Sequence, residues 1–238
     1  MVELLTYSEL VRRLKEVKEM NWVQTHRKGP TGIGKTLEDL LGITENNVPG
    51  PDAEMIELKS ARKNSGSMLT LFTKSPMPAK ANAVLLQKFG YDARGKGKPD
   101  LHTTVDALRY NMLRGKEGFK VDVSEDKIEL VCSGHNELLG YWDAATLKQS
   151  FERKLPRLMY VKADSRGKGE NEEFWFNEAW LLSGFSFENL VRLVKEGSIK
   201  VDIRIGQYED GRPHDHGTGF RVHPNKLDLC FDGRKSII

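Results

Sequence analysis

Apolar residues recur at helical spacing in several parts of the chain. Over residues 7–20 they recur three and four positions apart, which places them on one face of an amphipathic helix. These residues are Leu10, Val11, Leu14 and Val17. A second helix is predicted from Thr36, or further back from Gly32, to Leu41, where Gly42 supplies a C-terminal stop. Similar patterns predict helices at 79–91, 144–155 and 185–199, the last with a stop at Gly197.

Other stretches alternate apolar and polar residues, as strands with one buried face do. Alternation over 55–60 and 68–75 predicts two strands, which KNSGS would join as a hairpin. Residues 119–133 predict another hairpin, and a strand opens the stretch 156–167. Two further strands, at 199–208 and 218–224, are joined by EDGRPHDHG. Because helices and hairpins interleave, the pattern favours an α/β or α+β fold with a mixed sheet.

Composition narrows the class of protein. The 238 residues suffice for one large domain or two modest lobes, and 38% hydrophobic with 30% charged residues predict a globular protein. No apolar run reaches the roughly 18 residues of a membrane helix, and the N-terminus has no signal-peptide apolar segment. Only two cysteines occur, so we expect no disulfide scaffold and a cytoplasmic location.

Charge leaves the class of partner open. The net charge of +3 is mildly basic, which permits a nucleic-acid partner without requiring one. Basic residues gather at 26–28, 61–63 and 94–98, but any single cluster of this kind is more often a solvated loop.

Residues 29–36, GPTGIGKT, fit the pattern G-x-x-x-x-G-K-[ST] of a nucleotide-binding phosphate loop. Such a loop follows a buried strand and opens a helix. The helix is predicted, but in the preceding VQTHRK only Val23 is strongly apolar, and Asp164 is a weak candidate for an acidic magnesium ligand. In the alternative, the glycines let a helix start close to another backbone or a ligand, with Lys35 near a phosphate and Glu38 on the helix.

Residues 51–59, PDAEMIELK, carry a candidate catalytic set. Strand alternation places Glu57 and Lys59 on one face and Leu58 on the other, and Asp52 enters from the preceding turn. Carboxylates and a backbone carbonyl are ligands that Mg²⁺ prefers, and a lysine can orient a water and stabilise charge on a phosphate. The set suits phosphodiester hydrolysis, although a surface hairpin with a same-face ion pair explains the short pattern equally well.

Longer motifs resemble a known family. They are TGIGKTLEDLL at 31–41, PDAEMIELK at 51–59, LTLFTKSP at 69–76, IKVDIRIG at 199–206 and HDHGTGFR at 214–221. On these motifs the chain resembles the MvaI/BcnI type II restriction endonucleases over most of its length, and the MvaI branch most closely. That family is related to the mismatch-repair nickase MutH and to the PD-(D/E)XK nuclease superfamily.

The resemblance implies a PD-(D/E)XK restriction-endonuclease-like fold with a mixed central sheet and a MutH-like two-lobed architecture. We expect a catalytic lobe at 1–145 and a DNA-recognition lobe at 146–238. The implied activity is hydrolysis of phosphodiester bonds of duplex DNA by a monomer at a CC(A/T)GG site, with a companion DNA methyltransferase in the same system. No nucleotide and no membrane are expected as partners.

The resemblance also assigns residues. It implies Glu38, Asp52, Glu57 and Lys59 as the catalytic residues, with Mg²⁺ as cofactor. The metal ligands would be Asp52, Glu57 and the carbonyl of Leu58. It also implies that GPTGIGKT leads into the helix of Glu38 and is not a nucleotide loop.

Sequence readout is expected from the C-terminal motifs. The strand at 199–206 places Lys200, Asp202 and Arg204 on one face, where arginine can donate to guanine O6 and N7 and aspartate can accept from cytosine N4. A plain ion pair between Asp202 and Arg204 is the alternative. The resemblance adds three matching DNA-binding positions, which are His214, His216 and Arg221. A zinc site at the histidines is disfavoured because only His223 is nearby as a further ligand.

Phosphate contacts are expected from lysines. Candidates are Lys35 and Lys74, the latter one strand from the catalytic hairpin, although a solvated lysine explains Lys74 equally well. Lys154 and Arg157, before a strand, are further candidates to face DNA.

The chain departs from the family pattern in a shorter loop at 208–214 and in the middle third, which puts the recognition site in doubt. Three alternatives stay open. They are a MutH-like repair nickase, a DNA-binding protein without cleavage, and a nucleoside triphosphatase.

Overall fold

The computed structural model describes residues 5–43, 55–92, 95, 97–133, 138–155 and 157–238. The chain forms two compact units, each built from segments far apart in the sequence. The first unit comprises Met1–Ser67, Arg153–Phe185 and Phe231–Ile238, and the second comprises Met68–Glu152 and Ser186–Cys230. Each unit thus draws on both of the stretches to which the sequence assigned one lobe each, and the roles predicted for those two stretches stay a prediction.

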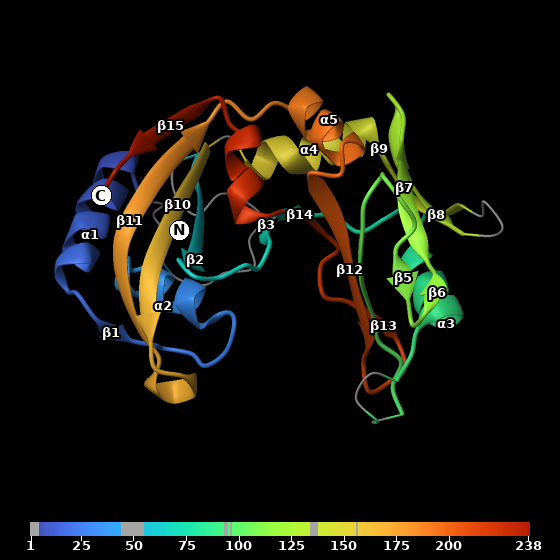
Figure 1. The fold of residues 1–238 in the computed structure, drawn as a ribbon, viewed down its shortest axis with the longest axis horizontal. Coiled ribbons are helices and arrows are strands. Elements are labelled where there is room, and N and C mark those ends of the chain that lie inside the picture. The colour runs from blue at the N-terminus through green and yellow to red at the C-terminus, as the bar shows by residue number, and fades with distance from the viewer. Residues whose placement is uncertain (1–4, 44–54, 93–94, 96, 134–137, 156) are drawn as a thin grey trace. The chain divides into compact units, whose positions relative to one another are not determined.

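The first unit is built on a five-stranded mixed sheet (Figure 1). Its strands are β1 (Val23–Gln24), β2 (Glu57–Arg62), β10 (Arg157–Arg166), β11 (Glu173–Ser183) and β15 (Gly233–Ser236). The order is β1-β11-β10-β2, and β15 pairs with β11 as well. β10 and β11 are antiparallel, whereas β2 runs parallel to β10, so the expected α+β class with a mixed sheet is confirmed.

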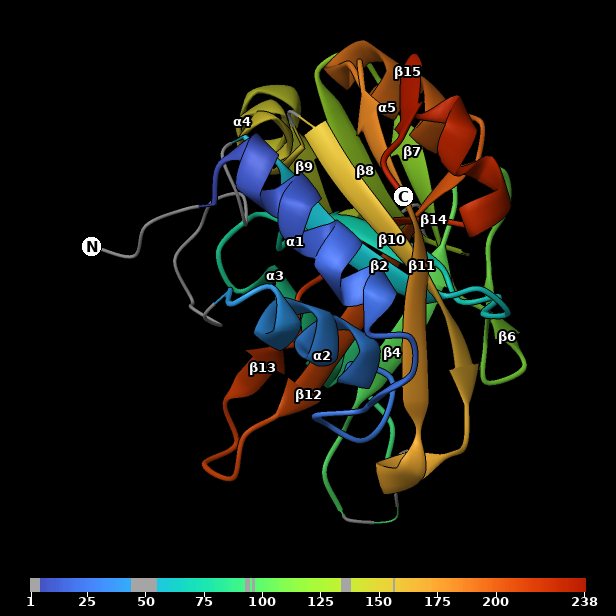
Figure 2. The same ribbon diagram turned by 90° about the vertical axis from the view of Figure 1, so that its left-hand side faces the viewer.

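Two helices cover one face of this sheet, α1 (Tyr7–Glu19) and α2 (Gly32–Leu40), as Figure 2 shows. Both were predicted from apolar spacing. A capping box starts α1, because the Thr6 hydroxyl accepts from the Glu9 amide and the Glu9 carboxylate accepts from the Thr6 amide. Gly42 follows α2 with a φ of +68°, the left-handed conformation of a helix stop. A short 3₁₀ turn, η1 (Gly169–Asn171), joins β10 to β11.

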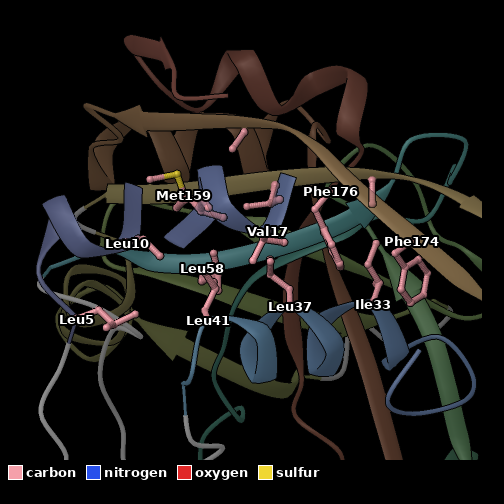
Figure 3. Close-up of a cluster of buried hydrophobic side chains, with 14 of the residues drawn as sticks. Leu5, Leu10, Val17, Ile33, Leu37, Leu41, Leu58, Met159, Phe174 and Phe176 are labelled. Carbon is pink, nitrogen blue, oxygen red and sulfur yellow. The ribbon is translucent and has the colours of Figure 1, made fainter. Parts of the chain in front are cut away.

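The core of the first unit lies between the two helices and the sheet (Figure 3). Buried residues of α1, α2, β2, β10 and β11 meet there, among them Leu10, Val17, Ile33, Leu37, Leu58, Met159, Phe174 and Phe176. Full burial of such a side chain contributes about 1.5–3 kcal/mol. The layer therefore fixes the position of β2, the strand of the candidate catalytic motif.

The described residues of the second unit form three sheets. Its five-stranded sheet has β3 (Leu69–Thr73), β4 (Leu101–Val105), β12 (Ile199–Gln207), β13 (Pro213–Asp215) and β14 (Gly219–Val222). Its three-stranded sheet has β7 (Phe119–Val123), β8 (Lys127–Cys132) and β9 (Leu138–Asp143). The third pairs β5 (Met112–Leu113) with β6 (Lys116–Glu117). The helical elements are α3 (Ala81–Phe89), α4 (Ala144–Lys154, whose last turn passes into the first unit), α5 (Phe187–Lys195) and η2 (Pro224–Leu229).

Aromatic packing holds the second unit's larger sheet in place. Phe72 of β3 stacks on Phe220 of β14 with ring centroids 4.8 Å apart, and Trp142 packs edge-on against Phe220 at 5.6 Å. The Trp142 indole also donates to the carbonyl of Lys74 at 2.8 Å. No helix among the described residues is long and apolar enough to cross a membrane.

Most predicted elements are confirmed, but one pairing was wrong. The helices at 79–91, 144–155 and 185–199 are α3, α4 and α5. The hairpin at 119–133 is β7–β8, and the strands at 199–208 and 218–224 are the antiparallel pair β12–β14. The stretches 55–60 and 68–75 do not form a hairpin, because β2 pairs with β10 and β3 pairs with β14. Alternation indicates which face of a strand is buried, but it does not indicate which strand pairs with it.

The sequence prediction missed β11, an eleven-residue strand of the first unit. Its buried residues do not alternate strictly, because the next buried residue after Phe176 is Ala179, three positions later, where alternation requires two. The pairing of β10 with β11 shifts register at Lys162/Ala163, and this irregularity resets which residues face the core. A search for strict alternation fails on such a strand.

Candidate active site

β2 brings two residues of the predicted catalytic set together. Glu57 and Lys59 share one face of the strand, and the Lys59 Nζ lies 2.6 Å from Glu57 Oε1. Leu58 points to the other face, into the core of the first unit (Figure 3). Glu57 is only 3% exposed. A buried carboxylate requires a positive partner, and Lys59 supplies one.

A second lysine reaches the same carboxylate. Lys154, at the C-terminal end of α4, has its Nζ 3.5 Å from Glu57 Oε2. The sequence made Lys154 a candidate to face DNA, but gave no reason to place it beside Glu57, 97 residues away. The available signal was a cationic pair, Arg153 and Lys154, at a helix end just before a strand. Each oxygen of the Glu57 carboxylate thus has an ammonium group nearby.

Helix α2 adds the third predicted catalytic residue. A pocket of about 330 Å³ lies between α2 and β2, and Glu38 and Lys35 line it together with Leu58, Lys59 and Ser60. Arg27 contributes a further positive charge to the wall. The structure therefore places Glu38, Lys35 and Lys59 around one cavity. Asp52, the remaining predicted ligand, lies outside the described residues.

Gly32 of GPTGIGKT has a packing role at the start of α2. A Cβ on Gly32 would lie 2.1 Å from the Arg27 carbonyl oxygen and 2.8 Å from the Thr25 hydroxyl, so no larger residue fits there. Thr36 links the helix to the same loop, since its hydroxyl accepts a hydrogen bond from the His26 amide at 2.9 Å and donates one to the Gly32 carbonyl at 2.8 Å. This motif docks the helix onto the preceding loop.

The surroundings of this loop differ from those of a phosphate loop. β1, the strand before it, has two residues and pairs antiparallel with β11. The loop carbonyls of Gly29 and Pro30 accept from the Arg62 guanidinium, and Arg62 also forms a two-pronged ion pair with Glu172. The Lys35 Nζ is held 2.7 Å from Asp39. This bond from Lys35, with a second from His26, lowers the pKa of Asp39.

The donor groups present fit a hard divalent cation. Glu57 offers a buried carboxylate, and Leu58 offers a backbone carbonyl on the same strand. Oxygen ligands of these two kinds are the ones that Mg²⁺ binds. No three His, Cys, Asp or Glu side chains gather as a metal site in the part of the chain that the structure describes, which omits Asp52.

In the second unit, the predicted base readers of β12 and β14 form an ion-pair cluster. The buried Asp202 carboxylate accepts from Arg221 Nη1 and the Thr104 hydroxyl, each at 2.7 Å, and lies 3.5 Å from Arg204 Nε. Arg204 Nη2 donates to the Gly217 carbonyl at 2.9 Å. The expected shared face, which also carries Lys200, is confirmed, and both arginines pair with Asp202.

The predicted histidines lie on and beside β13. His214 stacks on Tyr208 at 4.2 Å and lies 4.3 Å from His216 between ring centroids. Burial, followed by the nearby His214, lowers the pKa of His216, which keeps that ring neutral near pH 7. Between them, Asp215 accepts from the Asn82 amide at 2.8 Å and the Gly217 amide at 2.8 Å. The histidine pair is thereby anchored.

Lys74 was expected one strand from the catalytic hairpin, and this was wrong. It follows β3 in the second unit, where its amide donates to the Thr218 carbonyl at 2.9 Å. It lines a pocket of about 260 Å³ with Thr73, Ser75 and Gly217. Lys74 thus lies beside the segment of the predicted base readers.

Comparison with known proteins gave two kinds of match. The model of the MvaI/BcnI restriction endonuclease family matches residues 11–231. The solved complex of restriction endonuclease MvaI with its cognate DNA substrate is 34% identical, with a TM-score of 0.86 over 97% of this chain and 98% of that one. MvaI in the absence of DNA is also 34% identical, with a TM-score of 0.57 over 97% of each chain. The search of curated protein sequences found no match.

Proposed function

The chain belongs to the MvaI/BcnI restriction endonuclease family and is a type II site-specific DNA endonuclease. We propose that it cuts duplex DNA with an active site that contains Glu57 and Lys59. The observation that carries this proposal is the Glu57 carboxylate. It is buried, it lies on the strand of the PDAEMIELK motif, and an ammonium group stands at each of its oxygens. Evolved enzymes keep such a costly arrangement at catalytic centres.

The proposed cofactor is Mg²⁺, held by Glu57, the Leu58 carbonyl and Asp52, the last of which lies outside the described residues. When bound, the cation polarises the scissile phosphate and lowers the pKa of a bound water. The buried Glu57 side chain supplies the negative charge for this site. The family, usually dependent on a divalent metal, supports the same assignment.

The lysines and Glu38 act on the water and the phosphate. The Lys59 ammonium, which pairs with Glu57, would orient the attacking water and stabilise the negative charge that develops on the phosphate oxygens. Lys154 adds a second positive charge beside the far oxygen of Glu57. Glu38, which lines the α2–β2 pocket, is the proposed acceptor of a hydrogen bond from this water.

Sequence readout is assigned to the second unit. Arg204 and Arg221, oriented by Asp202, and the pair His214 and His216 are the proposed groups that face base edges. Lys35 and Lys74 are proposed to contact phosphates. The MvaI neighbour was solved with its cognate DNA, which supports duplex DNA as the substrate.

The finer features rest on the family resemblance. The proposed site is CC(A/T)GG-like, cut by a monomer that attacks one strand at a time, inside a restriction system with a companion DNA methyltransferase. Residues 1–145 would contribute mainly to cutting and residues 146–238 mainly to recognition.

Cleavage of supercoiled plasmid with Mg²⁺ and no ATP tests the proposal. Discrete linear fragments whose sequenced ends share one short motif are expected. Glu57→Gln and Lys59→Met should abolish cutting and leave DNA binding measurable, because neither change alters the core face of β2.

Glu170→Gln is the matched control, since that carboxylate is exposed and pairs only with exposed Lys28 at 3.2 Å among the described residues. It should cut as the wild type does. Nicked circles that never become linear would show a repair-type nickase instead. Equal cutting by Glu57→Gln and the wild type would refute this active site.

A further inference from the structure

The sheet face that carries Glu57 and Lys59 continues into aromatic and basic residues. Tyr160 of β10 lies directly beside Lys59 in the parallel register. Lys162 lies two residues further along β10 on the same face, and Trp180 of β11 is the antiparallel partner of Tyr160. This face is the one opposite to α1 and α2, because Met159 and Val161 point into the helix-covered core.

The hydroxyl of Tyr160 is an exception among buried polar groups. The residue is 4% exposed, and its hydroxyl oxygen has no hydrogen-bond partner among the described residues. Nearly all buried polar groups are hydrogen-bonded, so this hydroxyl calls for a partner that the described residues do not supply. Burial raises the pKa of Tyr160, and the group is therefore a protonated donor at neutral pH.

The ammonium of Lys162 is held by aromatic rings. Its Nζ lies 5.8 Å from the Tyr160 ring centroid and 5.6 Å from that of Trp180. Within the described ranges of the chain, no carboxylate lies within 4.0 Å of it. Glu178, its cross-strand partner, is the nearest candidate along the sheet, but the Glu178 carboxylate pairs with Lys63 at 2.7 Å.

Lys120 also makes a cation–π contact with a tyrosine, but its charge is neutralised by a carboxylate. Lys120 lies 5.4 Å from the Tyr110 ring centroid, in the same kind of cation–π contact. Its Nζ is also 2.7 Å from the Asp122 carboxylate, so the chain itself neutralises that charge. Lys162 has its rings without such an anion in the part of the chain that the structure describes, so no described carboxylate neutralises its charge.

We infer that Tyr160 and Lys162 form a phosphate subsite for the strand that is cut, binding a phosphodiester next to the one hydrolysed at Glu57 and Lys59. The inference rests on the proposed function. Tyr160 is one strand spacing from Lys59, about 4.8 Å, and Lys162 lies about 6.6 Å further along β10. The hydroxyl and the ammonium would both donate to the phosphate oxygens.

Binding of a cognate duplex, without metal and as a function of salt, separates the two groups. Lys162→Met should reduce affinity and lower the slope of log K against log salt by about one, because one phosphate contact of a cation is lost. Tyr160→Phe should reduce affinity severalfold and leave the slope unchanged, since it removes a neutral donor. Lys120→Met, which loses the matched cation–π contact, should change neither quantity.

The phosphate itself is located by substitution. Duplexes with one uncharged methylphosphonate at each position around the cut are cleaved by the wild type and by Lys162→Met in single turnover. At one position flanking the cut, the wild type should slow by about tenfold, as for loss of one charged contact, while Lys162→Met should show no further loss. Equal losses in both proteins at every position, or an unchanged salt slope, would overturn the subsite.

The controls separate failures of the two proposals. If the wild type does not cleave the unmodified duplex, the proposed function has failed. If the wild type cleaves it and both variants bind and cleave as the wild type does, the subsite alone has failed. Thermal unfolding of Tyr160→Phe and Lys162→Met checks that both variants are folded.

Discussion

The ion pair between Arg62 and Glu172 gives the sharpest test of how the loop before α2 is held. Arg62 Nε and Nη2 donate to the two Glu172 carboxylate oxygens at 2.6 and 2.7 Å. The same guanidinium donates to the carbonyls of Pro30 and Gly29 and lies 5.1 Å from the Phe174 ring centroid. We expect that breaking this pair destabilises the first unit and loosens the start of α2.

The magnitude follows from geometry and burial. The Arg62 and Glu172 side chains are 22% and 13% exposed, so the pair is mostly withdrawn from water. Arg62→Ala leaves Glu172 unpaired and removes the two loop contacts, which should cost about 3 kcal/mol of unfolding free energy. Glu172→Gln keeps the shape and should cost about 2 kcal/mol. The double variant should cost less than the sum by about 2 kcal/mol, because both single changes remove the same interaction.

Urea unfolding of the four proteins measures this coupling. The matched control is the ion pair between Arg166 and Glu173, the residue that follows Glu172. Its Arg166 Nε and Glu173 Oε2 are also 2.6 Å apart, but the two side chains are 54% and 34% exposed. Water screens that pair, and its double-variant cycle should show no measurable coupling. Single-turnover cleavage by Arg62→Ala should also slow, since α2 carries Glu38.

A coupling for Arg62 and Glu172 below about 0.5 kcal/mol, or one no larger than in the control pair, would refute the reasoning. It would mean that desolvation of the two charges cancels their attraction, and that packing on Phe174 fixes the loop.

Three further results are expected. Arg204→Ala should reduce the preference for the cognate site over a site changed at one base pair by about 1–3 kcal/mol, measured as a ratio of kcat/KM values, while a uniform fall on all sites would make Arg204 a phosphate contact. Lys35 and His26 lower the pKa of Asp39, so the paired carboxylate stabilises the fold above its ordinary pKa of 3.8 and this contribution is lost as the pH falls below it. Urea unfolding of Asp39→Asn should therefore show less loss of stability over that acid range than the wild type, and equal curves would contradict this. Burial raises the pKa of Cys230 to about 12, so in a Cys132→Ser background a thiol reagent at pH 8 should label Cys230 only after unfolding, and rapid labelling of the folded protein would contradict its burial.

The local elements were predictable where one face is buried and the period is regular. The stripe of Leu10, Leu14 and Val17 gave α1, and the alternation over 199–206 gave β12. Partners across the sheet were not predictable in the same way. Two alternating runs that flank a polar turn predict a hairpin after β2, yet β2 pairs with β10, about a hundred residues later.

The candidate site shows the same limit. The two-residue spacing of Glu57 and Lys59 is enough to place them together on one strand face, and their 2.6 Å contact confirms it. Lys154 was missed as a partner of Glu57, because nothing in its local pattern shows which carboxylate the end of α4 approaches. The roles of Tyr160 and Lys162 could not be anticipated either, since they depend on the neighbour strand and on rings across it.

By itself the sequence determined the family, the class of fold and the strand that carries Glu57 and Lys59, since these depend on motif identity and on side-chain period along one segment. Tertiary structure alone decided which loop Gly32 packs against, that β2 and β3 belong to separate sheets, and that two lysines meet at Glu57. The physical reason is the separation along the sequence over which each kind of interaction acts. Backbone period and local hydrogen bonding act over a few residues, whereas strand partners and ion pairs between distant segments are selected by burial in the complete fold.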